Sequence, residues 1–332
     1  MDVIAIWYGE ADAPQIPDVP PAPTVDSNCG YISVDTVRQP VDVLLVLDNS
    51  LSMNWSITED CYCKSGAGTG ATVCTDTTNC SVRWDAVKSA MDTTLSTSQY
   101  VNWGLKFLNP SSGSTCTVTK TIEVPVAADS ASKIQTQIGA VTLSLGTPTA
   151  AALTAATDYL KTLSDPNEKV ILLATDGEPN CGGNPASVNT DDVTGASNAA
   201  AAANTAGFPV YVIGIGPSLS NLTQLASNGG TKDYYPVTSP DQLASALSSI
   251  GKTIGSCKFT ANQEPPDSGN IGVYVNKNIV NKDDNNGWKF GASTQEIVLT
   301  GSYCDQMTSG NDATVQILFG CPGAPGFPPF VP

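Results

Sequence analysis

A short apolar run followed directly by oxygen side chains constrains this chain most. Val41–Leu47 is almost wholly apolar and rich in β-branched residues, which is typical of a strand covered on both faces of a parallel sheet. Asp48, Ser50 and Ser52 follow it at alternate positions. A carboxylate and hydroxyls at one strand end suit a hard divalent cation, which prefers oxygen ligands. A polar turn that caps the next helix would use the same residue types.

Two later stretches favour the cation. Glu168–Gly177 is a second buried-strand pattern that again ends in an aspartate, Asp176, and Leu145–Thr149 precedes an Ala-rich helical run. Asp-x-Ser-x-Ser, Gly-Thr-Pro-Thr and Thr-Asp-Gly, in this order, resemble the von Willebrand factor A domain over roughly residues 38–255. The resemblance implies the metal-ion-dependent adhesion site of that family, as found in secreted or surface proteins of bacteria. Its ligands here would be Asp48, Ser50, Ser52, Thr147 and Asp176.

The resemblance also implies how such a site works. Asp176 often acts through water in this family, and the cation keeps one coordination position for an acidic group of a partner. Mg²⁺ is our first choice because the site is rich in hydroxyls and poor in carboxylates, and Mn²⁺ and Ca²⁺ are the alternatives. We expect Asn49, Glu178 and Asn180 at the rim of the site.

Strands alternate with helices over most of the chain, which predicts an α/β fold, a doubly wound and mostly parallel sheet with helices on both faces. The family's strand order is 3-2-1-4-5-6 with one antiparallel edge strand. Ligands of such sheets bind where the order reverses, here between the strands that end in Asp48 and Asp176. Further strands are predicted at Val101–Leu108, Thr117–Val124, Val210–Ile215 and Tyr234–Val237. Helices are predicted at Ser81–Leu95, Ser130–Leu143, Pro148–Leu163 with Thr147 as N-cap, Ala196–Ala206, Leu219–Ser227 and Pro240–Ile254.

The composition changes at both ends of this pattern. We predict a Pro-rich linker over residues 1–30, the A domain over 31–255 with a Cys-rich insertion at 53–80, a small all-β appendage over 256–321 and a Pro-rich tail over 322–332. Asn286-Gly287 is a hairpin signal. The strands predicted in the appendage are Asn270–Val280, Gly287–Phe290, Gln295–Leu299 and Thr314–Phe319.

The chain has 10 cysteines, which indicates an oxidising compartment and a set of disulfides. The four in the insertion, Cys61, Cys63, Cys74 and Cys80, are expected to form two disulfides, with a zinc knuckle as the alternative. The predicted positions of the other six cysteines suggest three further pairs, although the sequence does not fix connectivity. These pairs are Cys116 with Cys181, Cys29 with Cys257, and Cys304 with Cys321.

Charge and composition exclude several classes of function. The 31 acidic and 15 basic residues give a net charge of −16, which argues against nucleic acid or anionic lipid as a partner. The absence of histidine excludes His-ligated zinc and Ser-His-Asp catalysis. No apolar run reaches transmembrane length, and Met1–Tyr8 is no convincing signal peptide. We expect an extracellular or cell-surface protein, with a lipid anchor or an outer-envelope location as variants of that expectation.

Three functions remain in order of preference. The first is an adhesion or ligand-binding protein, not an enzyme, that grips a protein or other ligand with an exposed carboxylate through its cation. The second is a structural subunit of a surface fibre or envelope assembly, with homo- or hetero-association through the β appendage. The last is a metal-dependent enzyme or a chelatase-type accessory domain, for which the chain lacks an evident nucleophile with a base.

Overall fold

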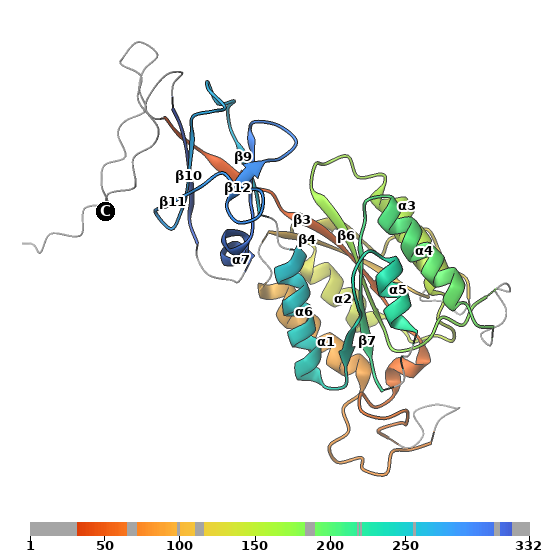
Figure 1. Ribbon diagram of the computed structural model, residues 1–332. Helices are drawn as coiled ribbons and strands as arrows, with labels where there is room; N and C mark the ends of the chain where they lie inside the picture. Colours follow the sequence, from red (N-terminus) through yellow and green to blue (C-terminus); the bar gives the residue numbers. More distant parts are fainter. Residues whose placement is uncertain are drawn as a thin grey trace, which may run out of the picture. The chain divides into compact units, whose positions relative to one another are not determined.

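The computed structural model describes residues 32–64, 72–97, 100–109, 116–182, 190–217, 219, 221–254, 257–308 and 313–320. They belong to two compact units (Figure 1). One unit is built from residues 39–256, and the other combines the chain up to Arg38 with the chain from Cys257 onward. The predicted linker 1–30 and tail 322–332 lie outside the described residues. Within these ranges, no helix combines the length and the apolarity that a membrane span requires.

The 39–256 unit is built on a six-stranded sheet in the order β5-β4-β3-β6-β7-β8. This is the predicted doubly wound order, with β3 at the point where the strand order reverses. All neighbours are parallel except β4 and β5. The strands are β3 (Val41–Leu47), β4 (Val101–Phe107), β5 (Val124–Ala127), β6 (Glu168–Thr175), β7 (Val210–Ile215) and β8 (Tyr235–Val237).

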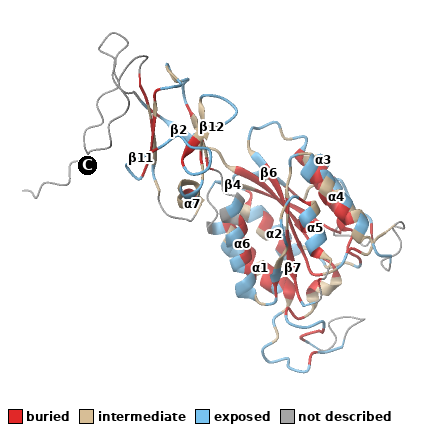
Figure 2. Ribbon diagram, in the orientation of Figure 1, coloured by how far each residue is buried: buried red, intermediate tan, exposed pale blue. Residues whose placement is uncertain are grey.

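Helices cover both faces of this sheet (Figures 1 and 2). Because successive residues of a strand point to opposite faces, Val43 and Leu45 enter one apolar core, and Leu44 and Val46 enter the other. One core includes residues of α1 (Arg83–Thr97), α2 (Ala131–Ala140) and α6 (Pro240–Ile254). The other includes residues of α3 (Thr149–Leu160), α4 (Val193–Thr205) and α5 (Leu222–Asn228). Every residue of β3 is buried, as its sequence predicts.

Two local predictions in this unit are wrong. The strand expected at Thr117–Val124 begins only at Val124, where β5 pairs with β4 through a register shift between Trp103 and Leu105. Thr147 is not the N-cap of α3, because Pro148 takes that position. The backbone N–H of Thr147 instead donates to Asn180 Oδ1 at 2.8 Å, so this residue belongs to the loop and not to the helix.

The second unit is a pair of antiparallel four-stranded sheets around one core. The first sheet has the order β1-β14-β10-β11 and the second the order β12-β13-β9-β2. The short helix α7 (Ser302–Thr308) adds Met307 to their core. The strands are β1 (Ile32–Val34), β2 (Thr36–Arg38), β9 (Lys258–Ala261), β10 (Ile271–Val275), β11 (Asn278–Val280), β12 (Trp288–Phe290), β13 (Glu296–Leu299) and β14 (Val315–Phe319).

The structure moves the first domain boundary. Residues 31–38 were assigned to the A domain, but β1 pairs with β14 and β2 pairs with β9, both antiparallel. The all-β unit is therefore assembled from residues 32–38 and from residues after 256, and the 39–256 unit is inserted between its second and third strands. Tyr31–Arg38 can be read from the sequence as a short strand that leads into Val41–Leu47, but its partners are more than 200 residues away and leave no local signal.

The hairpin of this unit lies at a different place than predicted. The segment expected to be one strand, Asn270–Val280, is a hairpin of β10 and β11. It turns at Asn276 and Lys277, whose φ angles are 49° and 66°. Lysine seldom adopts a positive φ, so the turn has no sequence signal. Asn286-Gly287 joins no hairpin, since β11 and β12 belong to different sheets.

The disulfide pattern of this unit also differs from the prediction. Cys257 pairs with Cys304, with their Cα atoms 5.4 Å apart, so neither Cys29–Cys257 nor Cys304–Cys321 forms. Cys257 immediately precedes β9 and Cys304 lies in α7, and both contact the core shared by the two sheets. The prediction placed Cys257 at the end of the A domain, whereas it belongs to the all-β unit. Cys29 and Cys321 lie outside the described residues.

A charge in β1 tests whether residues 32–38 belong to the all-β unit. Val34 is 6% exposed in its core, whereas Val37 on β2 is 71% exposed. We expect Val34→Asp to lower the free energy of unfolding of this unit by about 3 kcal/mol or more, because it buries an unpaired carboxylate. Val37→Asp is the matched control and should change it by about 0.5 kcal/mol at most. Urea unfolding followed by tryptophan fluorescence measures both, and equal effects would contradict the strand assignment.

Candidate metal centre

The predicted ligands lie on three loops at the carboxyl edge of the parallel sheet. Asp48 follows β3 and Asp176 follows β6, and these strands are parallel neighbours with Leu47 opposite Ala174. The backbone N–H of Asp48 continues this pairing by donating to Ala174 O at 2.9 Å. The strand order therefore brings two carboxylates that are 128 positions apart in the sequence to one edge.

Four of the five predicted ligands are joined by direct contacts. Ser50 Oγ and Ser52 Oγ lie 2.9 Å apart. The Ser52 hydroxyl donates to Asp176 Oδ1 at 2.8 Å, and the Ser50 hydroxyl lies 3.4 Å from the same oxygen. Asp48 Oδ1 accepts the backbone N–H of Ser50 at 2.8 Å. The two serine hydroxyls of the loop after β3 therefore meet Asp176, which follows β6.

Thr147 belongs to the third loop and lies beside the turn that follows Asp176. It is 3% exposed, and a Cβ placed on Gly177 would lie 3.8 Å from Thr147 Oγ1. Asn180 holds this loop, because its side-chain oxygen accepts the N–H of Thr147 while its own N–H donates to Thr147 O. The structure therefore places Thr147 next to the Asp176 loop.

The two carboxylates are buried with like charge. Burial raises the pKa of Asp48. Burial, together with the negative charge of the nearby Asp48, raises the pKa of Asp176 to about 7. Hydrogen bonds from Thr175 and Ser50 oppose the shift at Asp48, and Arg83 opposes it at Asp176. A cation would relieve this burial of negative charge, and hydroxyls with few carboxylates are a donor set that fits a hard divalent ion. The residues present therefore fit such an ion.

Arg83 is the residue of this centre that the sequence analysis missed. Its side chain is 1% exposed, and Nη1 donates to Asp176 Oδ2 at 2.8 Å. Nη2 reaches Asp60 in the insertion, and Nε donates to Ser56 O at 2.9 Å. Arg83 is the first residue of α1, where a cation opposes the helix dipole. That unfavourable position was the one available signal that Arg83 has a partner outside its own helix.

The structure corrects the role expected of Asn49. This residue is 0% exposed and lies beneath the site, where it accepts the N–H of Asn109 at 2.9 Å and donates to Asn109 O at 3.1 Å. Of the other predicted rim residues, Glu178 is exposed and accepts a hydrogen bond from Asn221, and Asn180 positions Thr147 as described above. Asn49 therefore ties two strand ends together and does not face a partner.

Disulfides brace two of the loops around the centre. Cys61–Cys74 and Cys63–Cys80 close the insertion, so the zinc-knuckle alternative is wrong. Cys116–Cys181 forms as predicted and ties the Asp176 loop to the segment before β5. When these cysteines are oxidised, the disulfides restrict the movement of the insertion and of the Asp176 loop.

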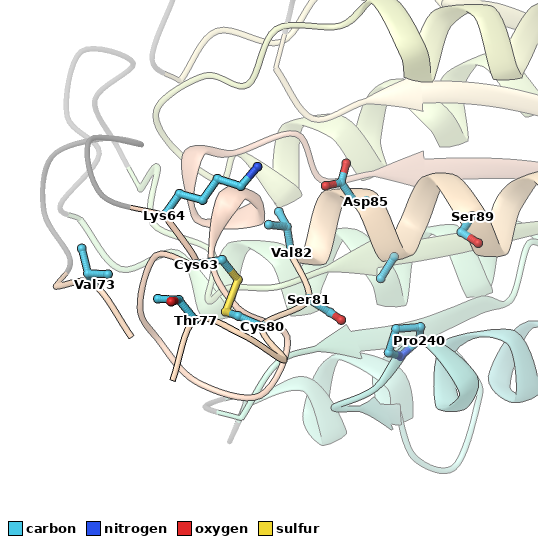
Figure 3. Close-up of a pocket in the computed structure, with 11 residues that line it drawn as sticks. Cys63, Lys64, Val73, Thr77, Cys80, Ser81, Val82, Asp85, Ser89 and Pro240 are labelled. Carbon is cyan, nitrogen blue, oxygen red and sulfur yellow. A yellow bond between two sulfur atoms is a disulfide. The ribbon is translucent and has the colours of Figure 1, made fainter. Parts of the chain in front are cut away.

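A pocket of about 790 Å³ lies beside the insertion and apart from the predicted ligands (Figure 3). The Cys63–Cys80 disulfide and Lys64 line one side, and Asp85 of α1 and Pro240 of α6 line the other. None of its described lining residues is a predicted ligand. The predicted ligands therefore lie on loop ends and do not line this pocket.

Comparison with known proteins supports the family. The sequence profile of the von Willebrand factor type A domain matches residues 111–249. The matched segment contains Thr147 and Asp176, and it begins after the Asp48–Ser52 loop and the insertion. No curated protein matches the chain.

Several solved structures are remotely similar. An aerotolerance-related membrane protein from Bacteroides fragilis has 18% identity and a TM-score of 0.46, with 64% of this chain and 98% of that chain covered. The open pilus adhesin SpaC from Lactobacillus rhamnosus GG has 16% identity and a TM-score of 0.48, with coverage of 87% and 40%. The PilB minor pilin from Streptococcus sanguinis has 17% identity and a TM-score of 0.48, with coverage of 66% and 62%. Likeness at this level assigns no partner to this chain.

The buried position of Asn49 gives a test of the loop arrangement. We expect Asn49→Ala to lower the free energy of unfolding by about 1–3 kcal/mol, because it leaves the backbone groups of Asn109 without their partner. Glu178→Ala, at the exposed rim, should change it by about 0.5 kcal/mol at most. Chemical denaturation of the two variants and the natural chain measures the difference. A neutral Asn49→Ala would show that Asn49 faces solvent.

Proposed function

We propose that this chain, whose residues 111–249 match the von Willebrand factor type A domain family, binds an acidic partner through a divalent cation. The cation would be held by Asp48, Ser50, Ser52, Thr147 and Asp176, with Mg²⁺ favoured over Mn²⁺ and Ca²⁺. The observation that carries the proposal is the meeting of the Ser50 and Ser52 hydroxyls with Asp176 Oδ1, at 3.4 and 2.8 Å.

Recognition follows from the charge of such a site. Two buried carboxylates offset a divalent charge, but the Arg83 guanidinium already neutralises one of them in part. The cation therefore retains net positive charge toward solvent, and a carboxylate of a partner is the ligand that completes its shell. The chain itself carries a net charge of −16, so its general surface repels an acidic partner. The cation supplies the local attraction.

We assign the site to recognition and not to catalysis. The chain has no histidine to act as a general base. Glu178, two positions after Asp176 in the sequence, is exposed and hydrogen-bonded to Asn221. Four disulfides among the described residues support an extracellular or cell-surface location, because such bonds persist in oxidising compartments.

Loss of the first ligand tests this proposal. Titration of the full chain with MgCl₂ by calorimetry should give binding for the natural protein and none for Asp48→Ala, because the variant loses the carboxylate nearest Ser50. Asp158→Ala, an exposed aspartate on α3, is the control and should bind as the natural chain does. Binding to a panel of immobilised acidic proteins should require Mg²⁺ and disappear in EDTA. Chelator-insensitive binding by all three proteins would contradict the proposal.

A second candidate is a subunit of a surface assembly. Among the described residues β2 is the last strand of its sheet, and its Val37 is 71% exposed. An edge strand with an exposed apolar residue favours pairing with a strand of another chain. Sedimentation of the full chain over a range of concentrations would show association that Val37→Asp weakens, and a strict monomer would count against this role.

A further inference from the structure

We propose that Arg83 makes Asp176 a one-oxygen ligand and thereby selects small six-coordinate cations, such as Mg²⁺, over Ca²⁺. The inference rests on the cation site proposed above and concerns what decides its choice of ion. Arg83 comes from the start of α1, outside the three loops that hold the five predicted ligands.

The two oxygens of Asp176 have different neighbours. Oδ2 accepts the Arg83 Nη1–H bond at 2.8 Å, within an ion pair whose side chains are 1% and 0% exposed. Oδ1 faces the hydroxyls of Ser52 and Ser50. An ion among these hydroxyls can therefore reach Asp176 through Oδ1, directly or through water. Binding through both oxygens would place the ion beside the Arg83 guanidinium and weaken a buried, charge-assisted hydrogen bond.

The second carboxylate, Asp48, is held by neutral donors at both of its oxygens. Asp48 Oδ2 accepts the Thr175 hydroxyl, and Oδ1 accepts the N–H of Ser50. An oxygen that accepts one hydrogen bond keeps a second lone pair, so Asp48 can still bind an ion through one oxygen. Binding through both oxygens would compete with both of its donors. Mg²⁺ needs six ligands in a regular octahedron and takes carboxylates one oxygen at a time, whereas Ca²⁺ takes six to eight ligands and often a bidentate carboxylate. The arrangement suits the smaller ion.

The insertion and β7 hold the guanidinium in this place. Nη2 pairs with Asp60, Nε donates to Ser56 O, and the group lies 5.6 Å from the centre of the Trp55 ring. A Cβ on Gly216, which follows β7, would lie 2.8 Å from Nη2, so only glycine leaves room there. The three nitrogens of arginine reach two carboxylates and a carbonyl in separate, fixed directions, whereas lysine has a single nitrogen. Arg83 is therefore fixed and acts as a positioning residue.

Its positive charge also weakens the attraction of any divalent ion to the site. Removing Arg83 would therefore raise the affinity for Mg²⁺ and for Ca²⁺ by electrostatics alone. Selection appears only in the ratio of the two dissociation constants. A purely structural role of Arg83 would leave that ratio unchanged.

The test measures this ratio by calorimetric titration of the full chain with MgCl₂ and CaCl₂. In Arg83→Met both oxygens of Asp176 become available to the ion. The dissociation constant for Ca²⁺ divided by that for Mg²⁺ should therefore fall by about tenfold or more, since substitution of residues that hydrogen-bond to metal ligands changes metal affinity by this much. Lys88→Met is the matched control, since Lys88 lies on the same helix with its side chain 41% exposed and should keep the natural ratio. An unchanged ratio in a folded Arg83→Met protein overturns the inference.

Arg83→Lys covers the case in which Arg83→Met does not fold. It keeps the charge but cannot hold Asp176 and Asp60 together, so the ratio should fall in the same direction by a smaller factor, and the natural ratio would overturn the inference. If the natural chain binds neither ion, the proposed function fails first. If it binds Mg²⁺ and the substitutions leave the ratio intact, only the role of Arg83 fails.

Discussion

Two buried carboxylates of like charge, Asp48 and Asp176, are the constraint around which the 39–256 unit is arranged. Each follows a central strand, and both are buried, with 0% and 6% exposure. Burial of unpaired charge is costly, so such a pair persists only where the surroundings supply positive charge and hydrogen-bond donors. Arg83 supplies the first and Ser50, Ser52 and Thr175 supply the second. A divalent ion would complete this balance.

The loops that bring these groups together are fixed by separate devices. Asn49 and Asn109 join the ends of β3 and β4, and Asn180 joins the Asp176 loop to Thr147. The disulfide Cys116–Cys181 ties the same loop to the segment before β5. The insertion reaches the centre through the contact of Asp60 with Arg83. The disulfide-braced insertion therefore helps to hold Arg83 in place beside Asp176. Through Arg83, the insertion would influence which ion the site binds.

The parts of the structure that could be predicted are those with a local signal. The apolar runs of β3 and β6 and the oxygen side chains after them lie in continuous sequence, so the sheet order and the predicted ligands follow from pattern and resemblance. Arg83 could not be found in this way, since its partner Asp176 is 93 positions away. Residues 32–38 pair with strands near the other end of the chain, and the Asn276-Lys277 turn uses a lysine with positive φ. The sequence suggested a rim position for Asn49 because asparagine is common in exposed loops. An asparagine side chain can equally be buried and hydrogen-bonded to the backbone, as Asn49 is to Asn109.

The central claim is that the Asp48, Thr147 and Asp176 loops hold one divalent ion. Anomalous diffraction from crystals of the full chain soaked in Mn²⁺ tests it most directly, since this ion scatters strongly and stands in for Mg²⁺. The account predicts a single strong peak within about 2.5 Å of the Ser50 and Ser52 hydroxyl oxygens. A peak elsewhere on the molecule, or no peak between these hydroxyls at saturating Mn²⁺, would contradict it.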